Sequence, residues 1–223
     1  MQLGEDTITM SMTLNPVNEA AFQKAVQSLE TLNRAAVFHP TGTGKSCIAW
    51  KVVEAHPQTT FFWLVAGAQR LALRQAELTR YNGGTLPGNV RFCDCEKLAA
   101  ATPEQWVRLG EQKPGCVVLD CYHELSAVCW AQSVQKLLRM CPQAKVLGLG
   151  VPNGAPVCAA AQELFADCIV SHMTVAEAMA AGTMPVPSAY AALLWPQEEE
   201  LATLRARIKT CVCPRATPPC ASI

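Results

Sequence analysis

The segment His39–Ser46 constrains the fold of this chain more strongly than any other part of it. It reads His-Pro-Thr-Gly-Thr-Gly-Lys-Ser, follows the apolar run Ala35–Phe38 and leads into the helical pattern of residues 46–55. Glycines allow a backbone to wrap around a phosphate with several N–H groups pointing inward. The first turn of the following helix adds unpaired N–H groups and the positive end of the helix dipole. The sequence therefore predicts a phosphate-binding loop between a strand and a helix.

The residue types in this loop fit one ligand chemistry. Lys45 would reach the β- and γ-phosphates of a nucleoside triphosphate, and the Ser46 hydroxyl would bind magnesium. The remaining phosphate contacts would come from the backbone of Thr41, Gly42, Thr43 and Gly44. His39 stands where the strict pattern has its first glycine, so a glycine-rich turn with a chance lysine is the alternative. The flanking strand and helix favour the first interpretation, with ATP and Mg²⁺ as the ligands.

The rest of the chain alternates between short apolar runs and helical patterns. The apolar runs have the length of strands buried on both faces, and they are Ala35–His39, Thr60–Ala66, Val90–Cys93, Cys116–Asp120 and Lys145–Leu149. The helical patterns cover Val17–Asn33, Ser46–Ala55, Gln69–Tyr81, Pro103–Leu109, Ser126–Met140 and Val157–Phe165. This alternation predicts βαβ units, and hence an α/β fold with a parallel sheet between helices.

The expected organisation is a single nucleotide-binding domain over residues 17–190. An irregular N-terminal segment, residues 1–16, precedes this domain. A C-terminal extension, residues 191–223, follows it, with one further helix expected over Gln197–Lys209 and a proline-containing end. The extension is either a native tail or the truncated start of a linker to a second domain.

Composition limits the classes of partner. The 18 Lys and Arg residues balance the 18 Asp and Glu residues, so the chain has no bulk attraction to nucleic acid or to a membrane. The apolar runs are too short to span a bilayer, and no secretory signal opens the chain, so a cytoplasmic location is expected. The twelve cysteines are then expected to be reduced thiols. A metal site in the tail, at Cys211, Cys213 and Cys220, is the alternative for three of them.

A second motif lies at the end of the apolar run Cys116–Asp120. Apolar residues lead there to an aspartate at the expected carboxyl end of a strand. A P-loop ATPase places its magnesium-binding carboxylate at such a position. The alternative is an aspartate that only caps the next helix. The presence of a phosphate loop favours the magnesium role for Asp120.

With these motifs in this order, the chain resembles the N-terminal RecA-like domain of superfamily-two DEAD/DEAH-box helicases, close to their type III restriction and UvrB-like branch. The resemblance covers Val17–Lys209, with motif I at His39–Ser46, motif Ia at Leu64–Gln75, motif II (Asp-Glu-x-His) at Asp120–His123 and motif III at Gly148–Asn153. It implies an ATP-dependent motor on nucleic acid, DNA in preference to RNA. It also implies catalytic roles for Asp120 and His123. Arg70 and Arg74 in motif Ia would contact a phosphate backbone, and a solvated helix face is the alternative for them.

Three parts of that motor are altered or missing in this sequence. Cys121 replaces the glutamate that orients the attacking water, and a thiol with a pKa of about 8.5 is mostly protonated at neutral pH. Loss of a general base typically lowers the rate by about 10²–10⁴. The residues 150–152 offer no hydroxyl where the family has Ser-Ala-Thr. A second RecA-like domain with its arginine finger would have to come from another chain, in trans.

Three functional hypotheses remain open at this stage. The first is the ATP-binding domain of a DEAD/DEAH-box-like helicase, weakly active or inactive as an isolated chain. The second is a nucleotide-binding pseudoenzyme or truncated remnant. The third is another P-loop enzyme, such as a small-molecule kinase, but the sequence lacks a basic cluster between the loop and Asp120 to act as a lid. The first two predict ATP binding that depends on Lys45, with little hydrolysis, and an increase in turnover when Cys121 is replaced by Glu.

Overall fold

The computed structural model describes residues 12–122, 128–152, 164–186 and 201–203. The chain divides into two compact units, Met1–Val186 and Pro187–Ile223. The sheet and its helices belong to the first unit. In the second unit only residues 201–203 are described, and they are helical. Most of the predicted helices at residues 157–165 and 197–209, and the tail cysteines, therefore lie outside the described residues.

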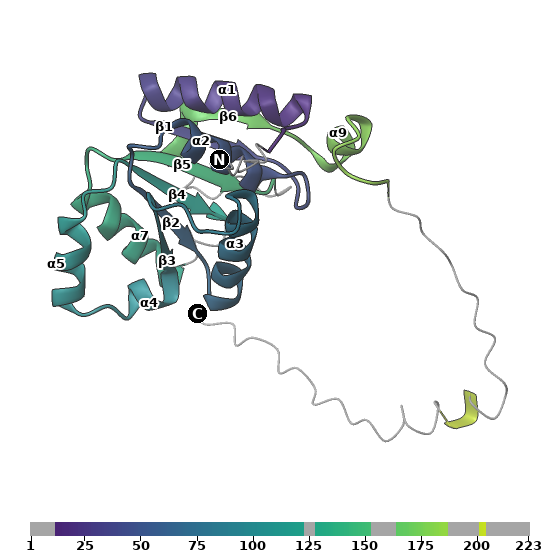
Figure 1. Ribbon diagram of the computed structural model, residues 1–223. Coiled ribbons are helices and arrows are strands. Elements are labelled where there is room, and N and C mark those ends of the chain that lie inside the picture. The colour runs from purple at the N-terminus through teal and green to yellow at the C-terminus, as the bar shows by residue number, and fades with distance from the viewer. Residues whose placement is uncertain (1–11, 123–127, 153–163, 187–200, 204–223) are drawn as a thin grey trace, which may run out of the picture. The chain divides into compact units, whose positions relative to one another are not determined.

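In the described part of the chain, six strands form one sheet in the order β3-β2-β4-β5-β1-β6 (Figure 1). All five neighbouring pairs are parallel. The strands are β1 (Arg34–Phe38), β2 (Phe61–Val65), β3 (Val90–Asp94), β4 (Cys116–Asp120), β5 (Lys145–Gly150) and β6 (Ile169–His172). The predicted α/β fold with a parallel sheet is confirmed.

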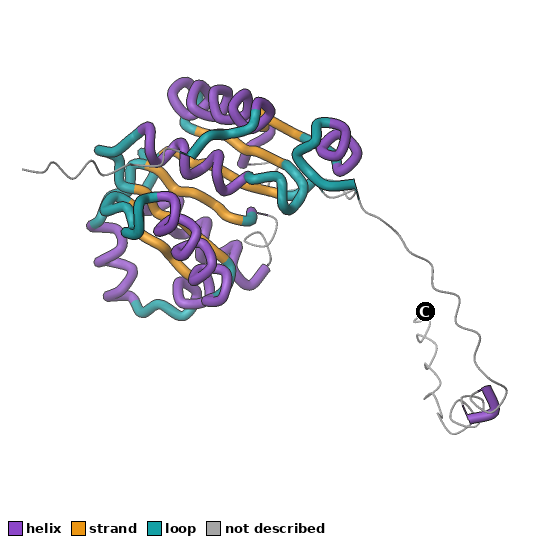
Figure 2. Tube along the Cα trace, turned by 45° about the vertical axis from the view of Figure 1, so that its right-hand side comes forward, coloured by secondary structure: helices purple, strands orange, loops and turns teal. Residues whose placement is uncertain are grey.

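Helices cover both faces of this sheet, so that the strands run between two helical layers (Figure 2). One face carries α1 (Pro16–Thr31), α2 (Lys45–Ala55) and α3 (Ala68–Tyr81). The other face carries α4 (Cys95–Ala99), α5 (Pro103–Glu111) and α7 (Val128–Met140). The 3₁₀ helix η1 (Ala166–Cys168) precedes β6, and α9 (Val175–Ala180) follows it.

Alternate residues of each central strand supply the two hydrophobic cores. In β2, Phe61 and Trp63 pack on the side of α1–α3, whereas Phe62 and Leu64 pack on the side of α4–α7. All four side chains are at most 1% exposed. Burial on both faces explains why these strands are continuous apolar runs and do not alternate between polar and apolar residues.

Among the described residues, four short elements were not predicted by the sequence patterns, namely α4, η1, β6 and α9. Each is three to six residues long, which is too short to show a hydrophobic period. β6 is at the edge of the sheet and none of its residues is fully buried, so it lacks the apolar character of the other strands. α4 begins where the Asp94 side chain accepts a hydrogen bond from the Glu96 amide. Local capping and edge pairing therefore define these elements.

Candidate functional site

The loop between β1 and α2 has the backbone conformation that its glycines predict. Gly42 and Gly44 have φ angles of 88° and 87°, in the left-handed region that favours glycine. Gly44 is the N-cap of α2, so Lys45 and Ser46 form the first turn of an eleven-residue helix. In that first turn the Cys47 amide donates to the N-cap carbonyl of Gly44 at 2.9 Å, and helix geometry leaves the amides before it without partners inside the helix. Strand, loop and helix thus follow one another as a phosphate-binding loop requires.

The Lys45 ammonium lies inside this loop. Its Nζ donates to the carbonyl oxygens of His39 at 2.7 Å and Pro40 at 2.8 Å, and the residue is 8% exposed. Burial and the charge of Arg74 lower the pKa of Lys45 from its ordinary value, while the nearby Asp120 carboxylate opposes that shift. The loop therefore has the Lys45 ammonium at its centre, where neutral carbonyl oxygens accept its hydrogen bonds. An anionic ligand can accept these hydrogen bonds in their place.

Helix α1 fixes the outer side of the loop. The side chain of Asn18, only 3% exposed, donates from Nδ2 to the carbonyl oxygen of Thr43 at 2.8 Å. A Cβ atom at Gly44 would lie 2.9 Å from that same Nδ2 atom. The Thr43 hydroxyl in turn donates to the carbonyl of Pro40 at 2.8 Å. Gly44 is thus required both by its φ angle and by the close approach of Asn18.

The sheet places Asp120 at the same edge as the loop. In the register, Phe38 at the end of β1 is opposite Gly150, and Asp120 at the end of β4 is opposite Leu149. β5 lies between these two strands, so their backbones are about 10 Å apart at the usual strand spacing. The carboxyl ends of the three strands are therefore level, and Asp120 faces the same region as the loop.

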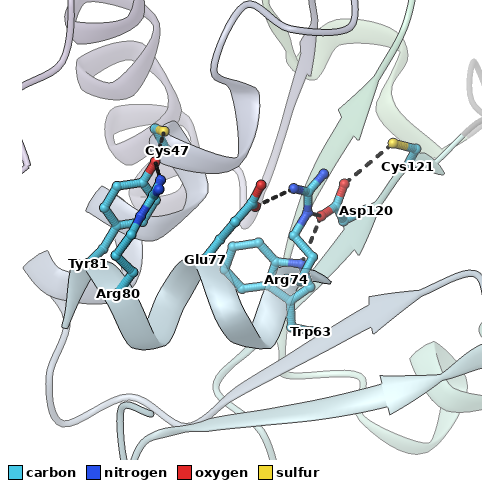
Figure 3. A network of polar contacts seen from close by, with 8 residues as sticks. All are labelled: Cys47, Trp63, Arg74, Glu77, Arg80, Tyr81, Asp120 and Cys121. Atoms are coloured by element: carbon cyan, nitrogen blue, oxygen red, sulfur yellow. Dashed lines mark hydrogen bonds and ion pairs between the residues drawn. The ribbon is translucent and has the colours of Figure 1, made fainter. Parts of the chain in front are cut away.

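Helix α3 contributes the main partner of Asp120 (Figure 3). Arg74 Nε donates to Asp120 Oδ2 at 2.6 Å, and Arg74 Nη1 donates to Glu77 at 2.5 Å. Trp63 Nε1 donates to the same Oδ2 atom at 3.1 Å. Burial lowers the pKa of Arg74, but the ion pairs with Asp120 and Glu77 outweigh that effect and raise it overall. Arg74 is therefore a permanent cation bound to a carboxylate that is 2% exposed.

The sequence patterns missed this role of Arg74. They left it on a solvated helix face or in contact with a phosphate backbone, and they gave Trp63 only a place in the apolar run Thr60–Ala66. Trp63 is indeed fully buried, but its indole N–H also holds Asp120. The pairing of Val65 with Asp120 brings the start of α3 beside the end of β4. Nothing in the local sequence around residue 74 indicates that pairing.

Cys121 remains a neutral thiol in this environment. Its Sγ donates to Asp120 Oδ1 at 3.4 Å. Burial and the neighbouring Asp120 charge raise the pKa of the thiol to about 11. At neutral pH the group beside Asp120 therefore cannot accept a proton from water, as the substitution of glutamate by cysteine already suggested.

A magnesium ion is the partner that the sequence predicts for Asp120 and Ser46. Magnesium is held in such sites by one or two carboxylates together with phosphate oxygens and waters. In this structure the charge of Asp120 is already compensated by Arg74, and both carboxylate oxygens accept hydrogen bonds. The arrangement therefore does not fit a divalent ion at Asp120, because the carboxylate that would bind the ion is already paired with a guanidinium.

The remaining predicted residues divide into two groups. His123, the predicted partner of Asp120 in motif II, lies outside the described residues, as does Asn153 of motif III. Gly148 and Gly150 of motif III are part of β5 and face aromatic rings, those of Phe165 and Phe38 respectively. At both positions a Cβ atom would come too close to the ring, so these two glycines allow close packing inside the domain.

Other classes of site are not indicated by the described residues. Within them, no group of three or more His, Cys, Asp and Glu side chains could hold a metal ion. Among the residues with described side chains, Cys47, Cys93, Cys95, Cys116, Cys121, Cys141 and Cys168 are free thiols. In the same part of the chain, no helix is both long enough and apolar enough to cross a membrane.

No protein-family model matches the chain, and no curated protein matches it. Sixteen chains of solved structures match its fold. One of them is domain III of the replication initiation protein DnaA from Thermotoga maritima, with 11% sequence identity and a TM-score of 0.37. That match covers 69% of this chain and 59% of the DnaA chain, so this protein spans about three fifths of the structure that it resembles.

Proposed function

We propose that this chain binds a nucleoside triphosphate, and ATP in particular, at the loop Thr41–Ser46. The observation that supports this most directly is the geometry of the loop. Two glycines with positive φ angles lead into the first turn of α2, and the ammonium of Lys45 lies within the loop. This arrangement offers a cation and the N-terminus of a helix to one anion.

We also propose that bound nucleotide is hydrolysed slowly or not at all. The thiol of Cys121 is neutral at physiological pH and stands where a carboxylate would orient water. Asp120, the second group on which hydrolysis would depend, is engaged by Arg74. A nucleotide-binding pseudoenzyme fits these features better than an active ATPase does.

The more specific proposal is that the chain is the ATP-binding domain of a DEAD/DEAH-box-like helicase that has lost most of its activity. Its support is the order of the motifs and the position of Asp120 at the sheet edge that carries the loop. In this proposal nucleic acid, DNA in preference to RNA, binds weakly, and a second RecA-like domain acts in trans. Titration with single- and double-stranded DNA and RNA, with and without ATP, tests this more specific claim.

The test of nucleotide binding is a calorimetric titration of the chain with ATP, ADP and AMP. We expect ATP to bind with a Kd in the range of about 1 μM to 1 mM that is typical of nucleotide sites. Lys45→Ala should weaken binding by about tenfold or more, because a charge-assisted hydrogen bond to phosphate contributes about 1.5–3 kcal/mol. Affinity should decrease in the order ATP, ADP, AMP.

The matched control is Lys51→Ala, which removes the same charge from the same helix. Lys51 pairs with Glu54 at 2.6 Å and is six residues beyond Lys45 in α2, more than one helical turn further along. Its removal should leave the ATP Kd within about twofold of the original, which is below 0.5 kcal/mol. An equal loss of affinity in both variants, or an unchanged Kd in Lys45→Ala, would contradict the assignment of the loop.

A further inference from the structure

The ion pair between Arg74 and Asp120 is held in place by further hydrogen bonds to both partners. Asp120 Oδ2 accepts from Arg74 Nε at 2.6 Å and from Trp63 Nε1 at 3.1 Å, and Glu77 binds Arg74 Nη1 on the other side. The guanidinium is therefore positioned by two carboxylates, as Figure 3 shows. The side chain of Asp120 is 2% exposed and that of Arg74 is 21% exposed, so solvent screens the pair only weakly.

Charge balance determines what this pair can bind next. Asp120 and Glu77 carry two negative charges, and Arg74 and Lys45 carry two positive ones. The positive charge of Arg74 lowers the pKa of Lys45, and the negative charge of Asp120 raises it. The three groups are therefore close enough to interact electrostatically. A divalent cation at Asp120 would meet a neutralised carboxylate and the repulsion of a guanidinium within hydrogen-bond distance of it.

Arg74 also retains donors for an anion. An arginine guanidinium has five N–H groups, and those on Nε and Nη1 contact Asp120 and Glu77. Among the described residues, Nη2 makes no hydrogen bond and is left with two N–H donors. Guanidinium groups match phosphate oxygens in geometry and in charge. Arg74 can therefore supply the positive charge toward a phosphate that a metal ion supplies elsewhere.

We propose that this chain binds its nucleotide as the metal-free polyphosphate, with Arg74 in place of the magnesium ion. This inference rests on the proposed nucleotide-binding function and narrows it to one ionic form of the ligand. The chemical class that the site accepts is then an uncomplexed nucleoside tri- or diphosphate. Asp120 serves to position Arg74 and does not serve as a metal ligand.

The experiment compares ATP affinity in buffer with excess EDTA and in buffer with excess MgCl₂, by calorimetry on the full chain. We expect the ratio of the two Kd values to stay within about threefold. Arg74→Gln should leave Asp120 without its cation and make binding prefer MgATP by about tenfold or more. Arg74→Lys, which keeps the charge, should retain more of the metal independence than Arg74→Gln does. Arg80→Gln, in the last turn of the same helix, is the matched control and should leave the ratio unchanged.

Asp120→Asn provides a second test that does not depend on how well the Arg74 variants fold. If Asp120 only positions Arg74, the ratio of Kd values in EDTA and MgCl₂ should stay near one in Asp120→Asn. A ratio in the original chain that favours MgATP by tenfold or more, and that Asp120→Asn abolishes, would overturn the inference and leave nucleotide binding intact. Failure of ATP to bind under both conditions would instead refute the proposed function, and this inference with it.

Discussion

At the scale of single residues, the buried His39 makes the stability of the fold depend on pH. Its side chain is fully buried, Nε2 lies 2.7 Å from Ser171 Oγ, and Nδ1 has no hydrogen-bond partner among the described residues. Burial, together with the charges of Lys45 and His172, lowers the pKa of His39 from 6.5 to about 4. The imidazole is therefore neutral in the folded chain over most of the acidic range.

This pKa predicts a loss of stability in mild acid. As pH falls below 6.5, the unfolded chain takes up a proton at His39 before the folded chain does, so the free energy of unfolding decreases. The loss continues down to about pH 4 and reaches about 3 kcal/mol at most. At higher pH this contribution disappears, because His39 is then neutral in both states.

Urea denaturation of the original chain and of His39→Gln, at pH 6.5 and pH 5, measures this effect. Glutamine can still donate toward Ser171 but does not titrate. Between pH 6.5 and pH 5, the free energy of unfolding of the original chain should decrease by about 1.5 kcal/mol more than that of the variant. Only the original chain has the shifted pKa of His39. Equal losses in the two proteins would show that His39 does not titrate as its burial requires.

At the scale of elements, β5 shows why glycines occur in a buried strand. A Cβ atom at Gly148 would lie 2.7 Å from both Cε2 and Cζ of Phe165, a side chain that is fully buried. Such a distance is shorter than carbon atoms tolerate, so the ring or the strand would have to move. The resemblance assigned this stretch to motif III, but its two glycines have a packing role in the described structure.

Gly148→Ala should therefore destabilise the fold by about 1–3 kcal/mol, as overpacking in a close-packed core does. The measurement is the urea midpoint, with the m-value as a check that both proteins unfold in the same way. Gly88→Ala is the control, because a Cβ atom there meets nothing within 4 Å. Phe165→Leu added to Gly148→Ala should recover part of the loss. A Gly148→Ala variant as stable as Gly88→Ala would contradict the packing explanation.

At the scale of the whole molecule, residues from separate elements limit catalysis together. Cys121 follows β4, whereas Arg74 belongs to α3, and the two meet only at Asp120. From the sequence alone, Cys121→Glu should raise turnover. The structure adds a second obstacle, because a glutamate at position 121 would still act beside a carboxylate that is paired with Arg74.

We therefore predict a non-additive effect on ATP hydrolysis in MgCl₂. Cys121→Glu and Arg74→Gln should each remain close to the original rate, and the double variant should exceed both by about tenfold or more. Steady-state phosphate release measures this, with circular dichroism to confirm that each variant is folded. A full increase in Cys121→Glu alone would show that Arg74 does not restrict Asp120. Hydrolysis by the original chain at a rate typical of helicases would refute the pseudoenzyme proposal.

The sequence by itself determined the features that depend on neighbours along the chain. Glycine conformations and a helix start define the loop His39–Ser46, and both are local properties. Continuous apolar runs identified five of the strands. A strand that is buried on both faces is apolar at nearly every position, and this pattern is visible without knowledge of the neighbouring strands. The position of Asp120 at the end of β4 followed from the same reasoning.

Only the tertiary structure decided what these residues contact. Arg74 reaches Asp120 because β2 pairs with β4, and Asn18 reaches the loop because α1 packs against α2. The residues of each contact are 46 and 25 positions apart in the chain, so no local pattern encodes them. Pairing of strands and packing of helices bring such groups together, and a buried charge then binds whichever opposite charge the fold places beside it.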